Sequence, residues 1–328
     1  MAKSPDFLDG LQAVTERFLT HRKTVRRVKR ERTKAKNPFL DWIEAFVWAA
    51  GVVLLVNQYL FQAYQIPSGS MIDTLLIGDR IFVDKLSFGP EVLPGVAKLP
   101  SPIKPKRNQI IIFENPSYIS RGPVFDVAQR VIYMLTLSVV DIDRDENGEP
   151  KAHFLIKRAV GMGGDRLAME RGEMSFLFAG ETRWVKEREY LEASRQIHTV
   201  NRLVADADYP HIWNAGRYAA YDDLRIAVPA DLEASFQKVK SLGNYDPLAF
   251  ERARLALHRA ASPQDKRYGA LYARYSLGWF VPEGRIFPMG DNRDNSRDAR
   301  YFGPVKATKV LGKASVIYWP LDRMGPVL

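Results

Sequence analysis

The sequence of 328 residues contains no cysteine. Disulfide bonds, thiolate metal sites and a cysteine nucleophile are therefore all excluded. The redox compartment stays open, because a chain without thiols tolerates an oxidising exterior. The sequence also lacks an internal repeat, which excludes solenoid and collagen-like architectures. A hydrophobic fraction of 46% is nevertheless enough for a substantial core.

Acidic residues are scarce near the N-terminus. Residues 1–36 hold eleven Lys/Arg against four Asp/Glu, which accounts for +7 of the net charge of +10. Nine of these cations fall in residues 21–36, a run that is as typical of a solvated tail as of a binding site. The remaining chain is only mildly basic, so we expect no nucleic-acid partner.

Charge is absent altogether from residues 45–64, a stretch of twenty residues that is close to the ~20 needed to cross a bilayer core. With the basic flank, this stretch predicts a membrane-spanning helix whose N-terminus is cytoplasmic. A buried core helix stays an alternative, because Asn57, Gln58 and Gln62 are polar. A cleaved signal sequence fits poorly, since no small-x-small site follows. We predict a basic tail at 1–38 and an uncleaved anchor at 39–64.

The segments after the anchor are typical of short strands, because they combine β-branched residues with turn-bounded ends. Residues 90–105, rich in proline, predict a loop or a hairpin. The expected strands are Asp79–Leu86, Gln109–Phe113, Phe154–Val160, Val281–Met289 and Lys313–Trp319. We therefore expect a mainly β catalytic body, formed by residues 65–171 and 279–328.

Residues 172–278 differ from the rest of the chain. Pro229–Leu242 and Asp246–Ala261 show helical spacing, and Asp246 followed by Pro247 fits the N-cap and first position of a helix. We predict an α/β insertion lobe with helices at 172–278. The expected fold class is a β body with one N-terminal transmembrane helix and this lobe.

Two residues carry possible nucleophilic chemistry. Ser70 follows the anchor in Gln65–Met71 (QIPSGSM), and Lys157 follows the apolar residues 154–156. A serine hydroxyl needs a base, and the five histidines show no accompanying triad pattern. A lysine amine serves only if desolvation lowers its pKa from ~10.4 by roughly 2 to 3 units. The alternatives are an ordinary Ser-Gly-Ser turn and an exposed cation at a strand end.

A dense polar cluster occupies residues 290–300 (GDNRDNSRDAR) and begins with glycine after an expected strand. It is also typical of a solvated loop or of an acidic metal-binding loop. Three arginines stand among its three aspartates, however, so salt bridges compete with a cation. We expect Asp298 to pair with Arg300 or Arg293, and we expect no metal site.

Taken together, the anchor and the segments near 65–89, 107–114, 154–168 and 279–319 resemble type I signal peptidase, a family of membrane-anchored serine proteases. The resemblance implies that Ser70 is the nucleophile and Lys157 the general base. It implies that the Ser68 hydroxyl and the Ser70 backbone N–H hold the oxyanion. By the same pattern Ser296 orients the lysine amine, Asp298 and Arg300 form a supporting ion pair, and the substrate pocket is formed by Ile66, Pro67 and Ile156.

The resemblance also implies the biology. Such enzymes remove signal peptides from exported preproteins after small-x-small sites, without a cofactor. The expected location is the cell membrane, as a single-pass protein with its catalytic domain on the extracytoplasmic side, in contact with lipid and possible export machinery. Asp73 stands where the family usually has proline, and a carboxylate near Ser70 raises the lysine pKa if it points inward.

Two other functions are compatible with parts of the sequence. A self-cleaving repressor-type protease shares the Ser/Lys pair and a β fold, but it carries a DNA-binding helix-turn-helix pattern that is missing here. A catalytically inactive, membrane-tethered binding or scaffold paralogue keeps the motifs as structure only. A covalent serine-directed probe separates that protein from an enzyme.

Overall fold

The computed structural model describes residues 16, 17, 19–25, 38–93, 97–146, 148, 151–195 and 198–327. The predicted basic tail at 1–38 lies mostly outside these residues. The chain divides into two compact units, residues 1–53 and 54–328. All predicted site residues belong to the second unit, which is described below by itself.

Helix α2 (Pro38–Tyr59) contains most of the predicted membrane segment. Its residues Phe39–Tyr59 are long and apolar enough to cross a membrane, with a mean hydropathy of 1.9. None of that apolar window is buried inside the protein, which argues against the alternative of a core helix.

The helix ends at Tyr59, five residues before the predicted end of the anchor at Tyr64, because strand β1 (Phe61–Gln65) begins two residues after the helix. Strand β1 pairs in antiparallel register with β2 (Arg80–Asp84). The buried Lys85 amine lies 3.4 Å from the carbonyl oxygens of both Asn57 and Gln58, so it supplies a positive charge to the last turn of α2. The uncharged stretch is therefore divided between a helix and a strand.

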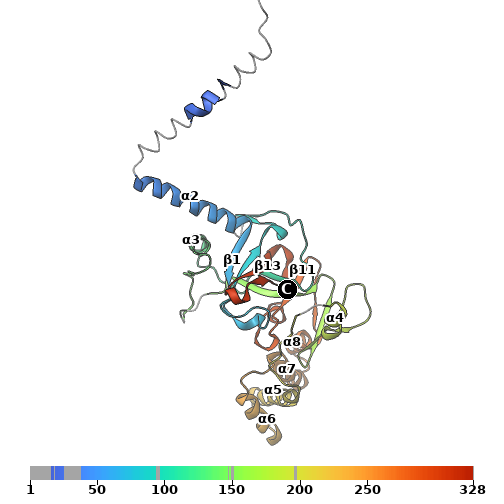
Figure 1. Cartoon of the computed structure of the whole chain (residues 1–328). Coiled ribbons are helices and arrows are strands. Elements are labelled where there is room, and N and C mark those ends of the chain that lie inside the picture. The colour runs from blue at the N-terminus through green and yellow to red at the C-terminus, as the bar shows by residue number, and fades with distance from the viewer. Residues whose placement is uncertain are drawn as a thin grey trace, which may run out of the picture. The chain divides into compact units, whose positions relative to one another are not determined.

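An eight-stranded antiparallel sheet forms the body of the second unit (Figure 1). Its strands follow the order β1-β2-β13-β5-β6-β11-β12, and β14 pairs with β13. Besides β1 and β2, the strands are β5 (Ile110–Glu114), β6 (Phe154–Met162), β11 (Arg285–Met289), β12 (Val305–Lys306), β13 (Val310–Trp319) and β14 (Gly325–Pro326). The predicted mainly β body is confirmed.

Strand β5 explains where the core lies. Ile110 and Ile112 pack into one buried cluster, while Ile111 and Phe113 pack into another. Successive side chains of a strand point to opposite faces, so the sheet is covered on both sides at this position. The continuous apolar run of β5 is the consequence, and its neighbour β6 is held in the middle of the body.

A second sheet has the order β10-β7-β8-β9. Its strands are β7 (Arg166–Glu170), β8 (Glu173–Leu177), β9 (Val185–Lys186) and β10 (Trp279–Phe280). Strands β7 and β10 lie in the predicted body, whereas β8 and β9 lie in the predicted lobe. This sheet therefore crosses the predicted boundaries, and the division into domains stays a prediction.

Helices fill most of the predicted lobe, and all but the first of them gather at one end of the second unit in Figure 1. They are α4 (Glu187–Ala193), α5 (Tyr209–Asp223), α6 (Ala230–Ser241), α7 (Pro247–Ala261) and α8 (Lys266–Ser276). The predicted start of α7 is confirmed, because the Asp246 side chain accepts hydrogen bonds from the backbone N–H groups of Leu248 and Ala249.

Four further elements lie outside the two larger sheets and the predicted lobe. Strands β3 (Glu91–Leu93) and β4 (Ala97–Lys98) pair with each other, as the hairpin interpretation of 90–105 predicts. Helix α3 (Pro123–Leu135) lies in the long connection between β5 and β6 and was not predicted. A short helix, α9 (Ala299–Phe302), ends the polar 290–300 loop.

Candidate active site

Ser70 lies in a 3-10 turn, Gly69–Met71, shortly after β1. The 290–300 loop holds this turn in place. The Asn292 side chain donates to the Gly69 carbonyl oxygen at 3.0 Å, and the Asn292 backbone N–H donates to the Ser70 carbonyl oxygen at 3.1 Å. Two segments far apart in sequence are therefore joined at the nucleophile candidate.

Gly290 makes this close approach possible. A Cβ atom on Gly290 would lie 2.5 Å from the Ser70 carbonyl oxygen and 2.2 Å from Ser296 Oγ. Neither separation is tolerated between non-bonded atoms, and one of the two contacts is to backbone that cannot turn away. A glycine at this position is required for the loop to pack against the turn.

Lys157 comes from the middle of β6 and is only 4% exposed. Its Nζ lies 2.6 Å from Ser70 Oγ and 3.1 Å from the Ile156 carbonyl oxygen. Burial lowers the pKa of Lys157 from its ordinary 10.5 to about 8, although the carboxylates of Asp298 and Asp291 act to raise it. The amine is therefore neutral in a sizeable fraction of molecules near pH 8.

The two serines predicted to assist lie near this pair with different contacts. Ser68 Oγ is 3.5 Å from Ser70 Oγ, and Ser68 is exposed. Ser296 is buried beside Gly290, but its hydroxyl makes no hydrogen bond. The structure thus brings Ser296 close to the turn that carries Ser70. It shows no hydrogen bond between the Ser296 hydroxyl and the Lys157 amine, so the role of Ser296 in orienting that amine stays a prediction.

Asp298 and Arg300 form a fully buried ion pair. Arg300 Nε donates to Asp298 Oδ1 at 2.9 Å, and Nη2 donates to Oδ2 at 3.0 Å. Burial opposes ionisation of Asp298, but the charge of Arg300 and hydrogen bonds from the Gly290 and Arg300 backbone outweigh it and hold the Asp298 pKa below its ordinary value. The pair therefore stays charged and ties both ends of the loop together.

A second buried ion pair was not anticipated from the sequence. Arg158, the residue after Lys157, donates from Nε and Nη2 to Asp291 at 2.8 and 2.7 Å. The Thr74 hydroxyl also donates to Asp291, at 2.7 Å. Both charged residues were visible in their motifs, but their pairing joins positions 133 residues apart. Only the apolar surroundings of Arg158 in β6 hinted at a buried partner.

The predicted lobe contributes two ion pairs to the 290–300 loop. Glu187, at the start of α4, pairs with both Nη atoms of the buried Arg293, whose Nε donates to the Gly290 carbonyl oxygen at 2.9 Å. Arg202 pairs with Asp294 at 3.0 Å. Arg293 therefore pairs with Glu187 and not with Asp298. Of the two partners expected for Asp298, the structure shows Arg300.

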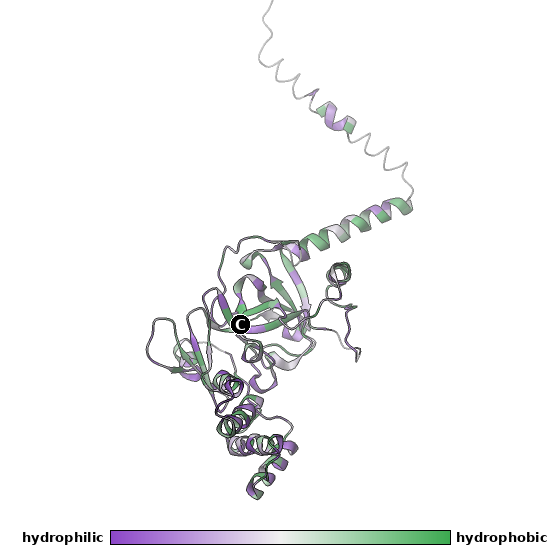
Figure 2. Cartoon of the chain, turned by 180° about the vertical axis from the view of Figure 1, so that it is seen from behind, coloured by the Kyte–Doolittle hydropathy of each residue, from purple (hydrophilic) through white to green (hydrophobic). Residues whose placement is uncertain are grey.

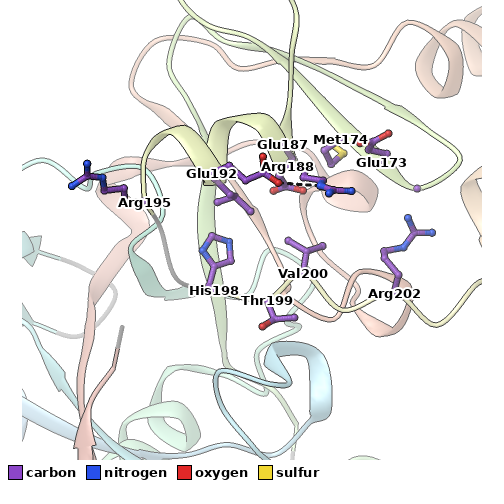
Figure 3. Close-up of a pocket in the computed structure, with 12 residues that line it drawn as sticks. Glu173, Met174, Glu187, Arg188, Glu192, Arg195, His198, Thr199, Val200 and Arg202 are labelled. Atoms are coloured by element: carbon purple, nitrogen blue, oxygen red, sulfur yellow. Dashed lines mark hydrogen bonds and ion pairs between the residues drawn. The ribbon is translucent and has the colours of Figure 1, made fainter.

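A cavity of about 690 Å³ is lined by residues of the predicted lobe, including Glu187 and Arg202 of these two ion pairs. Figure 3 shows Glu187, His198 and Arg202 among the side chains that line it. Ser70 and Lys157 do not line this cavity. Burial, together with the charge of Arg158, lowers the pKa of His198 to about 4, so this ring is neutral at physiological pH. The cavity is thus separate from the Ser70–Lys157 contact.

The residues predicted to form the substrate pocket have different exposures. Ile66 is buried in a core cluster, Pro67 is exposed, and Ile156 is half-buried against the same cluster as Ile66. Asp73 is exposed, and the charges that act on the Lys157 amine come from Asp298, Asp291 and Arg300. Asp73 therefore does not point inward at the amine.

This arrangement suits acyl transfer. An uncharged amine within hydrogen-bonding distance of a hydroxyl can accept its proton, and the buried ion pairs fix the loop that supports the hydroxyl. In the described part of the chain, no group of three His, Asp or Glu side chains is placed to hold a metal ion. The expected independence from metals and cofactors stays a prediction.

Comparisons with known proteins identify the family of this chain. A sequence profile described as signal peptidase, peptidase S26, matches residues 39–319. Signal peptidase I of Buchnera aphidicola subsp. Acyrthosiphon pisum is 25% identical over 306 residues, which cover 90% of this chain and 80% of the relative. Signal peptidase I of Haemophilus influenzae is 26% identical over 285 residues (86% and 70%), and that of Aquifex aeolicus is 26% identical over 276 residues (81% and 79%). The profile spans most of the chain, including every strand of the main sheet except β14, and the chain therefore belongs to the signal peptidase family, peptidase S26.

Proposed function

We propose that this protein is a membrane-anchored serine endopeptidase that removes signal peptides from exported preproteins after small-x-small sites. The observation that carries the proposal is the 2.6 Å contact between Lys157 Nζ and Ser70 Oγ, in surroundings that lower the pKa of the amine to about 8. Perturbed titration combined with a nucleophile contact is the pattern of an activated serine.

The reaction begins when the neutral Lys157 amine accepts the Ser70 hydroxyl proton as Oγ attacks the carbonyl carbon of the scissile peptide bond. Negative charge moves to the carbonyl oxygen, where the Ser68 hydroxyl and the Ser70 backbone N–H donate to it. The Lys157 ammonium then gives its proton to the departing amine, and the peptide bond breaks. This leaves an ester between Ser70 Oγ and the signal-peptide carboxyl group.

Hydrolysis repeats these steps with water. The amine, neutral again, takes a proton from water, and the resulting hydroxide attacks the ester carbonyl carbon. The ester bond breaks as the proton returns to Ser70 Oγ, which restores the enzyme. In our proposal Ser296 directs the amine once substrate has excluded water, and the Asp298–Arg300 pair keeps the loop rigid through both stages.

Specificity is assigned to Ile66, Pro67 and Ile156, whose apolar side chains admit small substrate residues and exclude large ones sterically. Location is assigned from α2, which is a candidate membrane span directly before β1. The basic flank favours a cytoplasmic N-terminus, and in our proposal the body meets lipid and emerging preproteins on the extracytoplasmic side.

The decisive test is cleavage of a preprotein with an Ala-x-Ala site by the full chain in liposomes, with the products sequenced. Wild type should cut after that site, and Ser70→Ala and Lys157→Ala should lose about 10³-fold or more in rate. Lys85→Ala, at the second buried lysine, is the matched control and should retain activity.

Cutting that survives both substitutions would mean another protease mechanism. A folded wild type that neither cuts nor reacts with a covalent serine-directed probe would favour the membrane-tethered binding or scaffold protein.

A further inference from the structure

Helix α3 turns its apolar side away from the protein. Val124, Val127, Val131 and Leu135 follow the spacing that places residues on one face of a helix. Val124 is 82% exposed, Val127 55% and Leu135 40%. A surface helix of a soluble protein normally packs such a stripe against the core, so α3 has the reverse orientation.

Polar contacts fix this orientation. Gln129, on the opposite face, is 3% exposed and donates to Asp141 Oδ1 at 3.0 Å. Arg130 pairs with Glu91 at 3.4 Å, and the Tyr133 ring lies 6.1 Å from the ring of Tyr64 in β1. Rotating the helix to bury its apolar stripe would break these contacts, and the partners left buried would lose their hydrogen bonds.

The inner face of α3 meets the end of the candidate membrane span. Gln129 and Arg130 line the same small cavity as Gln58 and Gln62. Gln58 belongs to the span Phe39–Tyr59, and Gln62 lies three residues after the end of that span. In Figures 1 and 2, α3 accordingly lies on the β1 side of the sheet, next to the end of α2 that leads into β1.

The surroundings of α3 are also apolar on the outside. Ile119 is 81% exposed and Val139 57%. The four charged residues between positions 115 and 142 each have a partner within the protein. These contacts join Arg121 to Asp143, Asp126 to Ser120, Arg130 to Glu91, and Asp141 to Gln129. An apolar surface of this kind, beside a membrane span, matches the headgroup boundary of a bilayer.

We propose that α3 is an interfacial helix, which lies in the headgroup region of the membrane that holds α2 and turns Val124, Val127 and Leu135 into the lipid. This inference rests on the membrane anchoring in the proposed function. A single span leaves the body free to turn about the anchor, whereas a second contact restricts that rotation. The Ser70–Lys157 contact is then held at a fixed height and direction above the bilayer, where cleavage sites emerge.

The absence of cysteine allows a direct test on the full chain. Val124→Cys, Val127→Cys and, as an exposed control on α6, Lys240→Cys each give one site for a nitroxide spin label. In liposomes we expect labels at 124 and 127 to collide several-fold more with oxygen, which concentrates in lipid, than with a water-soluble nickel chelate. The label at 240 should show the opposite preference. Equal exposure to nickel at 127 and 240 would overturn the proposal.

Spin–spin broadening at 127 would also overturn it, because that outcome assigns the stripe to contact with a second copy of the chain. An activity measurement separates this proposal from the proposed function. Val127→Glu should slow cleavage of a preprotein in liposomes about three- to tenfold, yet leave cleavage of a short Ala-x-Ala peptide in detergent unchanged, with Lys240→Glu silent in both. An unchanged rate in liposomes would contradict the proposal, whereas the spin labels report on α3 even in an enzyme that cuts neither substrate.

Discussion

Lys157 and Lys85 are both buried, at 4% and 3% exposure, and burial lowers the pKa of each to about 8. Their partners differ. The Lys157 amine lies 2.6 Å from a serine hydroxyl, while the Lys85 amine lies 3.4 Å from two backbone carbonyl oxygens at the end of α2. The same degree of burial therefore places one amine against a hydroxyl group and the other against the carbonyl end of a helix.

The comparison shows that a depressed lysine pKa does not by itself identify a base. The net lowering of the pKa, with burial as its main cause, is of the same size in both places and corresponds to about 3 kcal/mol for each amine. The difference lies in what the neutral amine can do next. A hydroxyl can give it a proton, whereas a carbonyl oxygen has none to give.

Among the effects that test this comparison of the two lysines, the pH dependence of cleavage should be the largest. In the proposed mechanism the Lys157 amine acts in its neutral form, so activity should rise with pH, by about 50-fold between pH 6 and pH 8, and level off above the pKa of about 8. The measurement is kcat/KM for an Ala-x-Ala peptide across that range. Lys85→Met should leave the curve in place, and a shifted curve in that variant would undo the distinction between the two lysines.

Glu187→Gln should have the next largest effect, because it removes the charge that pairs with the buried Arg293 beside Gly290. We expect kcat to fall about tenfold with little change in KM, and the free energy of unfolding to fall by about 3 kcal/mol. Steady-state kinetics and thermal unfolding in detergent measure the two effects. Glu173→Gln, which removes an exposed ion pair with Lys186, is the matched control. An unchanged kcat would show that the lobe does not support the site.

Lys85→Met should have the smallest effect, and it should be on stability. Below pH 8 the folded protein carries the cost of burying a charged amine, and this cost disappears as pH rises from about 8 to 10.5. Replacement by methionine should thus raise the free energy of unfolding at pH 7 by about 1 kcal/mol, and by less at pH 9.5. Thermal unfolding at the two pH values tests the sign, and a larger gain at pH 9.5 would contradict it.

The sequence was sufficient for five strands of the main sheet, β2, β5, β6, β11 and β13, and for α6 and α7, because their signals are local. Strand β5 has a continuous apolar run, and α7 has an N-cap aspartate followed by proline. The end of the anchor was predicted too late, because Phe61–Gln65 is uncharged whether it forms a helix or a strand. Pairing with β2 decided the matter, and such pairing cannot be seen in the stretch itself.

The site was predictable to a similar extent. Ser70, Lys157, Asp298 and Arg300 were found because their motifs are compact, and the structure brings them together. The Glu187–Arg293 contact was missed, since it joins residues 106 positions apart and Glu187 sits in an unremarkable helical stretch. Helix α3 was missed although its apolar residues recur at helical spacing. Its outward orientation could not be predicted, because such spacing is normally interpreted as a face that packs against the core.

The neighbouring cations of β6 have one more consequence. Adjacent strand residues point to opposite faces, so a slip of one residue would put the Arg158 guanidinium, which cannot release a proton, where the Lys157 amine belongs. The Arg158–Asp291 pair resists such a slip, because Arg158 has a buried partner in only one register. A change in the length of the connection at 115–153 should therefore leave the amine beside the hydroxyl.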